Sequence, residues 1–79
     1  MPKALVINGY TFKFYSNENN EPPHVHIIKA DGNAKYWLEP KCSEDYSDGF
    51  NVRENRDIRE LVINNRSLLI DKGNEYFRK

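Results

Sequence analysis

The sequence predicts an α+β domain in which a four-stranded, mainly antiparallel β-meander, built from two hairpins, is covered by a long or broken C-terminal helix. In the first half of the chain, short runs of alternating apolar and polar residues are separated by Asn-Gly and Asp-Gly pairs, which are typical hairpin turns. After residue 50 the apolar residues recur at i, i+3 and i+4, as on a helix with one buried face. With 79 residues, we expect a single domain over 1–79.

The first hairpin is predicted to have strands at 4–7 and 10–15, joined by a tight Asn-Gly turn. Strand side chains alternate between the two faces of a sheet. Tyr10, Phe12 and Phe14 therefore share one face, and we assign that face to the core.

The second hairpin is predicted to have strands at 24–29 and 34–38, with an Asp-Gly turn between them. Pro22 and Pro23 lack backbone N–H donors, so they must precede a strand or lie on a sheet edge. The partner-binding interpretation given below makes the strand that follows them an edge strand, and we expect Pro40 to stop the returning strand.

Two histidines lie one residue apart at the start of the second hairpin. His24 and His26 fall on one face of the predicted strand, and Val25 and Ile27 fall on the other. Because the valine and isoleucine make the more apolar face, we assign them to the core and the histidines to the outside.

The C-terminal half is predicted to be a connector followed by a helix. Residues 41–51 have the composition of an acidic loop, with Phe50 docking on the core. The helical pattern begins at about Glu54, and we expect the helix to bend or break near residues 64–65 or at Gly73.

Composition limits the class of protein. Lys plus Arg number 12 and Asp plus Glu also number 12, so the net charge is zero. A zero net charge argues against a protein whose whole surface attracts nucleic acid, but it allows a local basic patch. The single Cys42 excludes an internal disulfide. No apolar run approaches the roughly 20 residues of a membrane span, and the N-terminal apolar run is too short for a signal peptide. We expect a cytoplasmic protein that does not bind membranes.

The order of motifs resembles the bacterial domain-of-unknown-function family 4160 over nearly the whole chain. The residues that carry the resemblance are Phe12-x-Phe14-Tyr15-x-x-Glu18, Pro22-Pro23-His24-Val25-His26, Asp31-Gly32-x-Ala34-Lys35-x-Trp37-Leu38-x-Pro40, Phe50-Asn51, and Ile58, Leu61, Val62, Asn65, Leu69 and Tyr76 of the helix. The resemblance implies a small stand-alone protein that is encoded beside a second small protein, as in toxin–antitoxin gene pairs. It implies no established activity. Members usually carry tryptophan where this chain has Gly73, which leaves the last helical turns less firmly packed or ends the helix before that glycine.

One functional hypothesis is a metal-independent ribonuclease or an RNA-binding protein, with no cofactor. Histidine titrates near neutral pH, so His24 and His26 are candidates to exchange protons with ribose hydroxyls. Lys35 is the candidate to stabilise charge on phosphate. The candidate binding residues are Glu18, Tyr15, Tyr36 and Trp37.

A second hypothesis is a metal site, since imidazoles at i and i+2 on a strand can chelate one ion and nearby glutamates such as Glu18, Glu21 or Glu39 can add oxygen ligands. A His-x-His pair without a second fixed pair is a weak signal, and we predict no metal.

A third hypothesis is a module that binds a partner protein, or a second copy of itself, by strand addition or face packing. In this interpretation His24 and His26 only bond to neighbouring glutamates or backbone, Trp37 belongs to the core with the phenylalanines, and Lys35 is solvated. The expected partners are thus the second small protein encoded nearby, RNA, or another copy of the chain.

Overall fold

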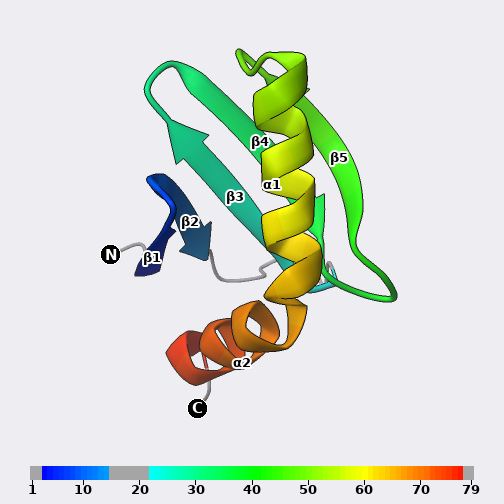
Figure 1. Ribbon diagram of the computed structural model, residues 1–79. Helices are drawn as coiled ribbons and strands as arrows, with labels where there is room; N and C mark the ends of the chain where they lie inside the picture. The colour runs from blue at the N-terminus through cyan, green and yellow to red at the C-terminus, as the bar shows by residue number, and fades with distance from the viewer. Residues whose placement is uncertain (1–2, 15–21, 78–79) are drawn as a thin grey trace.

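The computed structural model describes residues 3–14 and 22–77, and within them the chain forms an antiparallel sheet followed by two helices (Figure 1). The elements in chain order are β1 (Lys3–Ile7), β2 (Tyr10–Phe14), β3 (His24–Lys29), β4 (Gly32–Trp37), β5 (Ser43–Asp48), α1 (Val52–Asn64) and α2 (Arg66–Phe77). Each strand pairs with its neighbour in sequence, in the order β1-β2-β3-β4-β5. The predicted α+β meander with a helical C-terminus is confirmed.

The fifth strand is a difference from the prediction, which interpreted this part of the chain as an acidic connector. In β5, Asp48 pairs with Asn33 and Tyr46 pairs with Lys35, and a register shift follows between Lys35 and Tyr36. The segment Ser-Glu-Asp-Tyr-Ser-Asp has no apolar alternation because its residues are exposed or half-buried at the sheet edge. An edge strand that buries neither face lacks the signal by which strands are recognised.

The first hairpin turn lies where its Asn-Gly pair predicts it, whereas the second does not lie where its Asp-Gly pair predicts it. Asn8 and Gly9 both adopt positive φ, 52° and 83°, as predicted for a tight Asn-Gly turn. In the second hairpin the turn lies one residue earlier than predicted, with Ala30 at a φ of 52°. Gly32 is instead the first residue of β4, where an added Cβ would lie only 2.5 Å from Cε1 of Phe50. This glycine serves the close packing of Phe50, which docks on the core as expected.

Helix α1 begins two residues before the predicted start because Asn51 caps it. The Asn51 side chain accepts a hydrogen bond from the Glu54 backbone N–H at 2.8 Å, and the Glu54 carboxylate accepts one from the Asn51 N–H at 3.0 Å. This is a capping box. The helix breaks at Asn65, as predicted. The expectation that the helix might end before Gly73 is wrong, since α2 continues past it and the glycine lies against the Phe14 ring.

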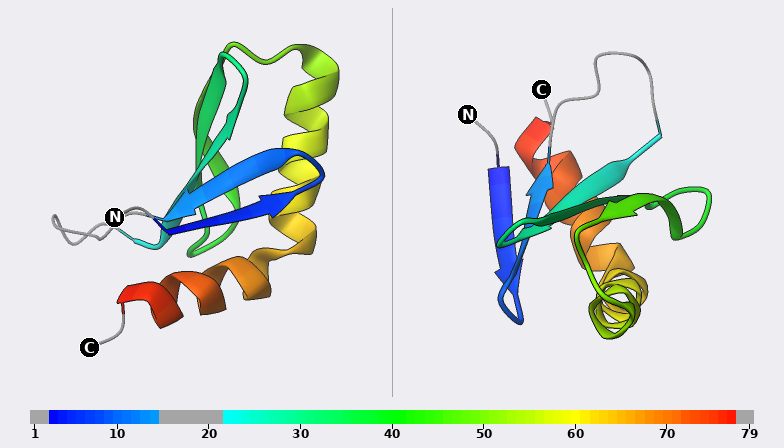
Figure 2. Two further views of the ribbon diagram at one scale, coloured as in Figure 1. Left: turned by 90° about the vertical axis from the view of Figure 1, so that its left-hand side faces the viewer. Right: turned by 90° about the horizontal axis from the view of Figure 1, so that it is seen from above.

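The helices cover one face of the sheet. Helix α1 runs along that face and α2 turns across its end, while no described helix covers the opposite face (Figures 1 and 2). The buried hydrophobic residues between these layers are Tyr10, Phe12, Phe14, Val25, Ile27, Ala34, Tyr36, Leu38, Ile58, Val62 and Leu69. The core-face assignments for β2 and β3 are confirmed. We call the covered face the inner face and the other the outer face.

The strand that follows the diproline is interior to the sheet. The prediction of an edge strand there is wrong, because β3 pairs with β2 on one side and with β4 on the other. The Pro23 carbonyl continues the pairing by accepting from the Leu38 N–H at 2.9 Å. The edges of the sheet are β1 and β5. None of the helices in the described ranges is long and apolar enough to cross a membrane.

Candidate functional site

The candidate site is a group of side chains on the outer face of the sheet. Strand pairing places Lys13, His26, Lys35 and Tyr46 side by side across β2, β3, β4 and β5. His24 pairs with Trp37 in the adjacent row. We call the group of these six residues the histidine face. It exists because strand residues of one parity share a face, and the inner face of the same strands is filled with apolar residues.

The rings of the histidine face form a continuous chain. His24 lies 5.4 Å from Trp37 and 5.5 Å from His26 between ring centroids, both edge-to-face. His26 lies 6.5 Å from Tyr46. These separations are within the range of favourable contacts between aromatic rings. The four rings therefore make one ordered surface that spans three strands.

A lysine ammonium group lies over this surface. Lys35 Nζ is 4.3 Å from the centroid of the Trp37 ring, within the distance of a cation–π interaction. The same Nζ is 3.5 Å from Oδ2 of Asp45. Asp45 stands at the register shift of β5, so the irregularity brings a carboxylate beside Lys35. The ring contact and the ion pair together hold the lysine side chain beside the rings.

The hydrogen-bond partners of the two imidazoles differ in what they can donate and accept. His24 Nδ1 lies 3.1 Å from the Pro22 carbonyl oxygen, and because a carbonyl only accepts, Nδ1 carries the proton. Neutral His24 then has its lone pair on Nε2. His26 Nδ1 lies 3.4 Å from the Tyr46 hydroxyl. When the hydroxyl donates, Nδ1 carries the lone pair and Nε2 carries the proton. Neutral His24 thus suits a proton acceptor at Nε2, and His26 can donate a proton from Nε2 when its ring is protonated.

Four of the candidate residues predicted from the sequence lie together in the structure, and Tyr36 lies apart from them. His24, His26, Lys35 and Trp37 lie together, so Trp37 is a half-buried part of the outer face and not of the core. Tyr36 lies on the inner face and is 2% exposed. Its hydroxyl donates to Glu44 at 3.4 Å, and burial followed by the negative charge of Glu44 raises the pKa of Tyr36 to about 12.

Some candidates lie outside the described residues, and others were missed. Tyr15, Glu18 and Glu21 fall outside the described ranges. Tyr46 was missed because its segment carries no strand signal. Lys13 was placed on the outward face of its strand, but only the strand pairing joins it to the histidines.

Two other possibilities for chemistry among the described residues are a metal site and a reactive cysteine. Within 3–14 and 22–77, no three His, Cys, Asp or Glu side chains converge as metal ligands do. Cys42 is half-buried with its thiol 3.8 Å from the Val62 carbonyl oxygen. Burial raises the pKa of the Cys42 thiol, which Arg66 opposes, and a raised thiol pKa disfavours the nucleophilic thiolate.

The comparison with known protein families gives the same family as the order of motifs in the sequence. The profile of the domain of unknown function DUF4160 matches residues 9–72, a span that includes β2 to β5, α1 and the first part of α2. No curated protein and no solved structure matches significantly. The matched span contains every residue of the histidine face and covers most of the sequence, so the chain belongs to the DUF4160 family.

Proposed function

We propose that the histidine face binds single-stranded RNA. The observation that carries this proposal is the row of alternating cations and rings across four strands, in which Lys13, His26, Lys35 and Tyr46 are consecutive cross-strand neighbours. Proteins that bind single strands combine positive charge that follows the backbone with rings on which bases stack. An antiparallel sheet with one open face presents both kinds of group on one surface.

The distribution of charge defines what kind of binding to expect. The chain has zero net charge, so nonspecific attraction over the whole surface is weak. Lys13 and Lys35 would contact phosphates, while Trp37 and Tyr46 would stack on bases. Few phosphate contacts produce a shallow dependence of affinity on salt, because each contact releases about one counterion. We expect modest affinity that depends strongly on the rings.

Binding is tested by fluorescence anisotropy with a short unstructured RNA. Trp37→Leu is expected to weaken binding about tenfold, because stacking on one aromatic side chain contributes roughly 1–3 kcal/mol. Lys35→Ala is expected to weaken binding and flatten the salt dependence. Lys72→Ala is the matched control, since it removes one lysine from α2, away from the histidine face. Equal losses in Lys35→Ala and Lys72→Ala, or no binding by the wild-type protein, would contradict the proposal.

RNA cleavage is the second candidate function, and it is favoured by the lone pair on His24 Nε2 and by the second imidazole beside it. His24 Nε2 would accept the proton of a ribose 2′-hydroxyl, whose oxygen attacks the adjacent phosphorus. The P–O5′ bond breaks, and His26, in its protonated imidazolium form, donates the proton on Nε2 to the leaving oxygen. The products are a 2′,3′-cyclic phosphate and a free 5′-hydroxyl. Lys35 would stabilise the charge on the phosphoryl oxygens.

Cleavage and binding are separated by the histidine variants. His24→Ala and His26→Ala are each expected to lower the cleavage rate by about 100-fold or more, while RNA affinity falls only a few-fold. A substrate with a 2′-deoxyribose at the scissile position should bind without being cut. Binding of RNA by the wild-type protein without any turnover would eliminate cleavage and leave RNA binding standing.

The family resemblance supports a further part of the proposal, in which this small cytoplasmic protein works with a second small protein encoded nearby, as in a toxin–antitoxin pair. Expressing the chain alone and together with the neighbouring gene product tests this. Growth arrest that the partner relieves, and that His24→Ala with His26→Ala abolishes, would support it. Normal growth on expression alone, with no complex on mixing, would refute it.

A further inference from the structure

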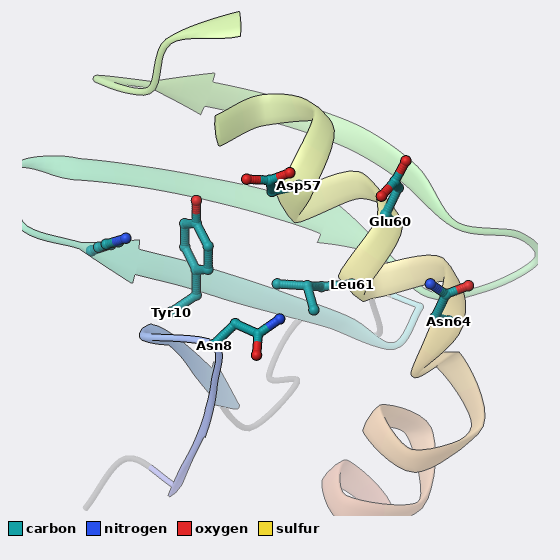
Figure 3. Close-up of a pocket in the computed structure, with 7 residues that line it drawn as sticks. Asn8, Tyr10, Asp57, Glu60, Leu61 and Asn64 are labelled. Atoms are coloured by element: carbon teal, nitrogen blue, oxygen red, sulfur yellow. The ribbon is translucent and has the colours of Figure 1, made fainter. Parts of the chain in front are cut away.

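A cavity lies on the opposite side of the sheet from the histidine face. It has a volume of about 320 Å³ and opens between the β1–β2 turn, the end of β3 and helix α1 (Figure 3). The lining residues are Asn8, Tyr10, Lys29, Asp57, Glu60, Leu61 and Asn64. The cavity shares no residue with the histidine face, so the two are separate surfaces of the molecule.

The hydroxyl of a largely buried tyrosine points into this cavity. Tyr10 is 4% exposed, and its hydroxyl is directed toward the side of the cavity where Asp57 lies (Figure 3). None of the described residues forms a hydrogen bond with this hydroxyl. The hydroxyl is therefore available to a molecule that enters the cavity.

The charges around this hydroxyl are mainly negative. Asp57 and Glu60 are three residues apart on α1 and both line the cavity. Neither forms an ion pair with any described residue. The Lys29 ammonium lies 4.7 Å from the centroid of the Tyr10 ring, in cation–π contact. Burial, and after it the negative charges of Asp57 and Glu54, raises the pKa of Tyr10, which Arg53 opposes.

We propose that this cavity binds a guanidinium group on a short aliphatic chain. The planar guanidinium has five N–H donors and forms paired hydrogen bonds with carboxylates. Asp57, Glu60 and the Tyr10 hydroxyl supply acceptors on the helix side, and the amide oxygens of Asn8 and Asn64 supply more at the rim. Leu61 contacts the aliphatic chain. The group comes either from a free alkylguanidine or from an arginine side chain of a peptide.

The test is a titration followed by ¹H–¹⁵N NMR of the full chain, with ethylguanidine and N-acetyl-arginine-methylamide as probes. We expect saturable shifts at residues 8–10 and 57–64. Tighter binding of the arginine derivative assigns the ligand to a peptide, and equal binding assigns it to a free alkylguanidine. Shifts that do not saturate, or that are matched by acetamide at the same concentration, would overturn the proposal.

Variants link the binding to the cavity. Asp57→Asn with Glu60→Gln is expected to weaken binding about tenfold or more, since two charge-assisted hydrogen bonds become neutral ones. The matched control is Asp71→Asn with Glu75→Gln, which removes the same charge from α2 outside the cavity. Tyr10→Phe keeps the buried ring and should weaken binding several-fold. Equal weakening in the control, or full affinity in Tyr10→Phe together with Asp57→Asn, would overturn the proposal.

Discussion

The two faces of the sheet are built from the same strands and have opposite characters. On the inner face Phe12, Val25 and Ile27 are fully buried. Their immediate neighbours Lys13 and His26 lie on the outer face and are only half-buried. Helices α1 and α2 cover the inner face, and no described helix covers the outer one (Figure 2). One strand sequence thus encodes a core and a polar surface at alternate positions.

The difference between the two faces separates residues that are explained by burial from residues that are not. The inner residues are explained by burial, since apolar surface removed from water contributes about 25 cal/mol per Å². Burial does not explain why Trp37, His24 and His26 form an ordered chain of rings on the open face. The proposed contact with RNA gives this aromatic residue and the two histidines beside it a role that burial does not.

The largest contrast between the faces is expected for two adjacent residues of β2. Phe12→Ala removes a fully buried ring and should destabilise the protein by about 3–5 kcal/mol, a large part of the stability of a domain this size. Lys13→Ala should change stability by less than about 0.5 kcal/mol. Urea denaturation followed by circular dichroism measures both. Comparable losses in the two variants would mean that the outer face is also structural.

Alkaline unfolding tests the inner face through Tyr36. Its pKa is raised from 10.0 to about 12 in the folded protein, so the fold holds the phenolic proton more tightly than the unfolded chain does. The stabilisation is complete below pH 10 and is lost as the pH rises toward about 12. Two pKa units correspond to at most about 3 kcal/mol.

Tyr36→Phe should remove this part of the pH dependence. At neutral pH the variant loses only a 3.4 Å hydrogen bond to Glu44, which contributes about 1 kcal/mol or less. Urea midpoints at pH 8 and at pH 10 to 11 compare the two proteins. Parallel loss of stability above pH 10 in the wild type and in Tyr36→Phe would show that other groups control alkaline unfolding.

Where a local rule was sufficient, the fold was predictable. The Asn8-Gly9 turn, the alternation that sends Phe12 inward, and the helix break at Asn65 all follow from short stretches of sequence. The turn at Ala30 did not, because a non-glycine residue adopts positive φ there while Gly32 is required by the Phe50 ring. Packing against Phe50 therefore sets the position of this turn, and the Asp-Gly pair does not.

The candidate site was predictable within a strand but not between strands. The spacing of His24 and His26 places them on one face wherever the strand lies. The pairing of His24 with Trp37 and of Lys35 with Tyr46 depends on register across three strands, which no local pattern encodes. For the same reason the local pattern was equally compatible with Trp37 in the core. Tyr46 was not identified because the polar composition of β5 gives no strand signal.

The smallest expected effect on stability belongs to Tyr46→Phe, and it separates ligand chemistry from structure on the outer face. Tyr46 is 41% exposed and its hydroxyl lies 3.4 Å from His26 Nδ1, so stability should change by less than about 0.5 kcal/mol. The ring remains for stacking, and RNA affinity should be retained. Without a donor at Nδ1, however, the tautomer of His26 with its proton on Nε2 loses its support.

Nitrogen NMR of the histidine rings at alkaline pH, where imidazole is ordinarily neutral, measures this tautomer directly. The population of Nε2–H at His26 should fall in Tyr46→Phe, while His24 keeps its proton on Nδ1 because its partner is the Pro22 carbonyl. Identical tautomers in both proteins would show that Tyr46 does not orient the proton of neutral His26.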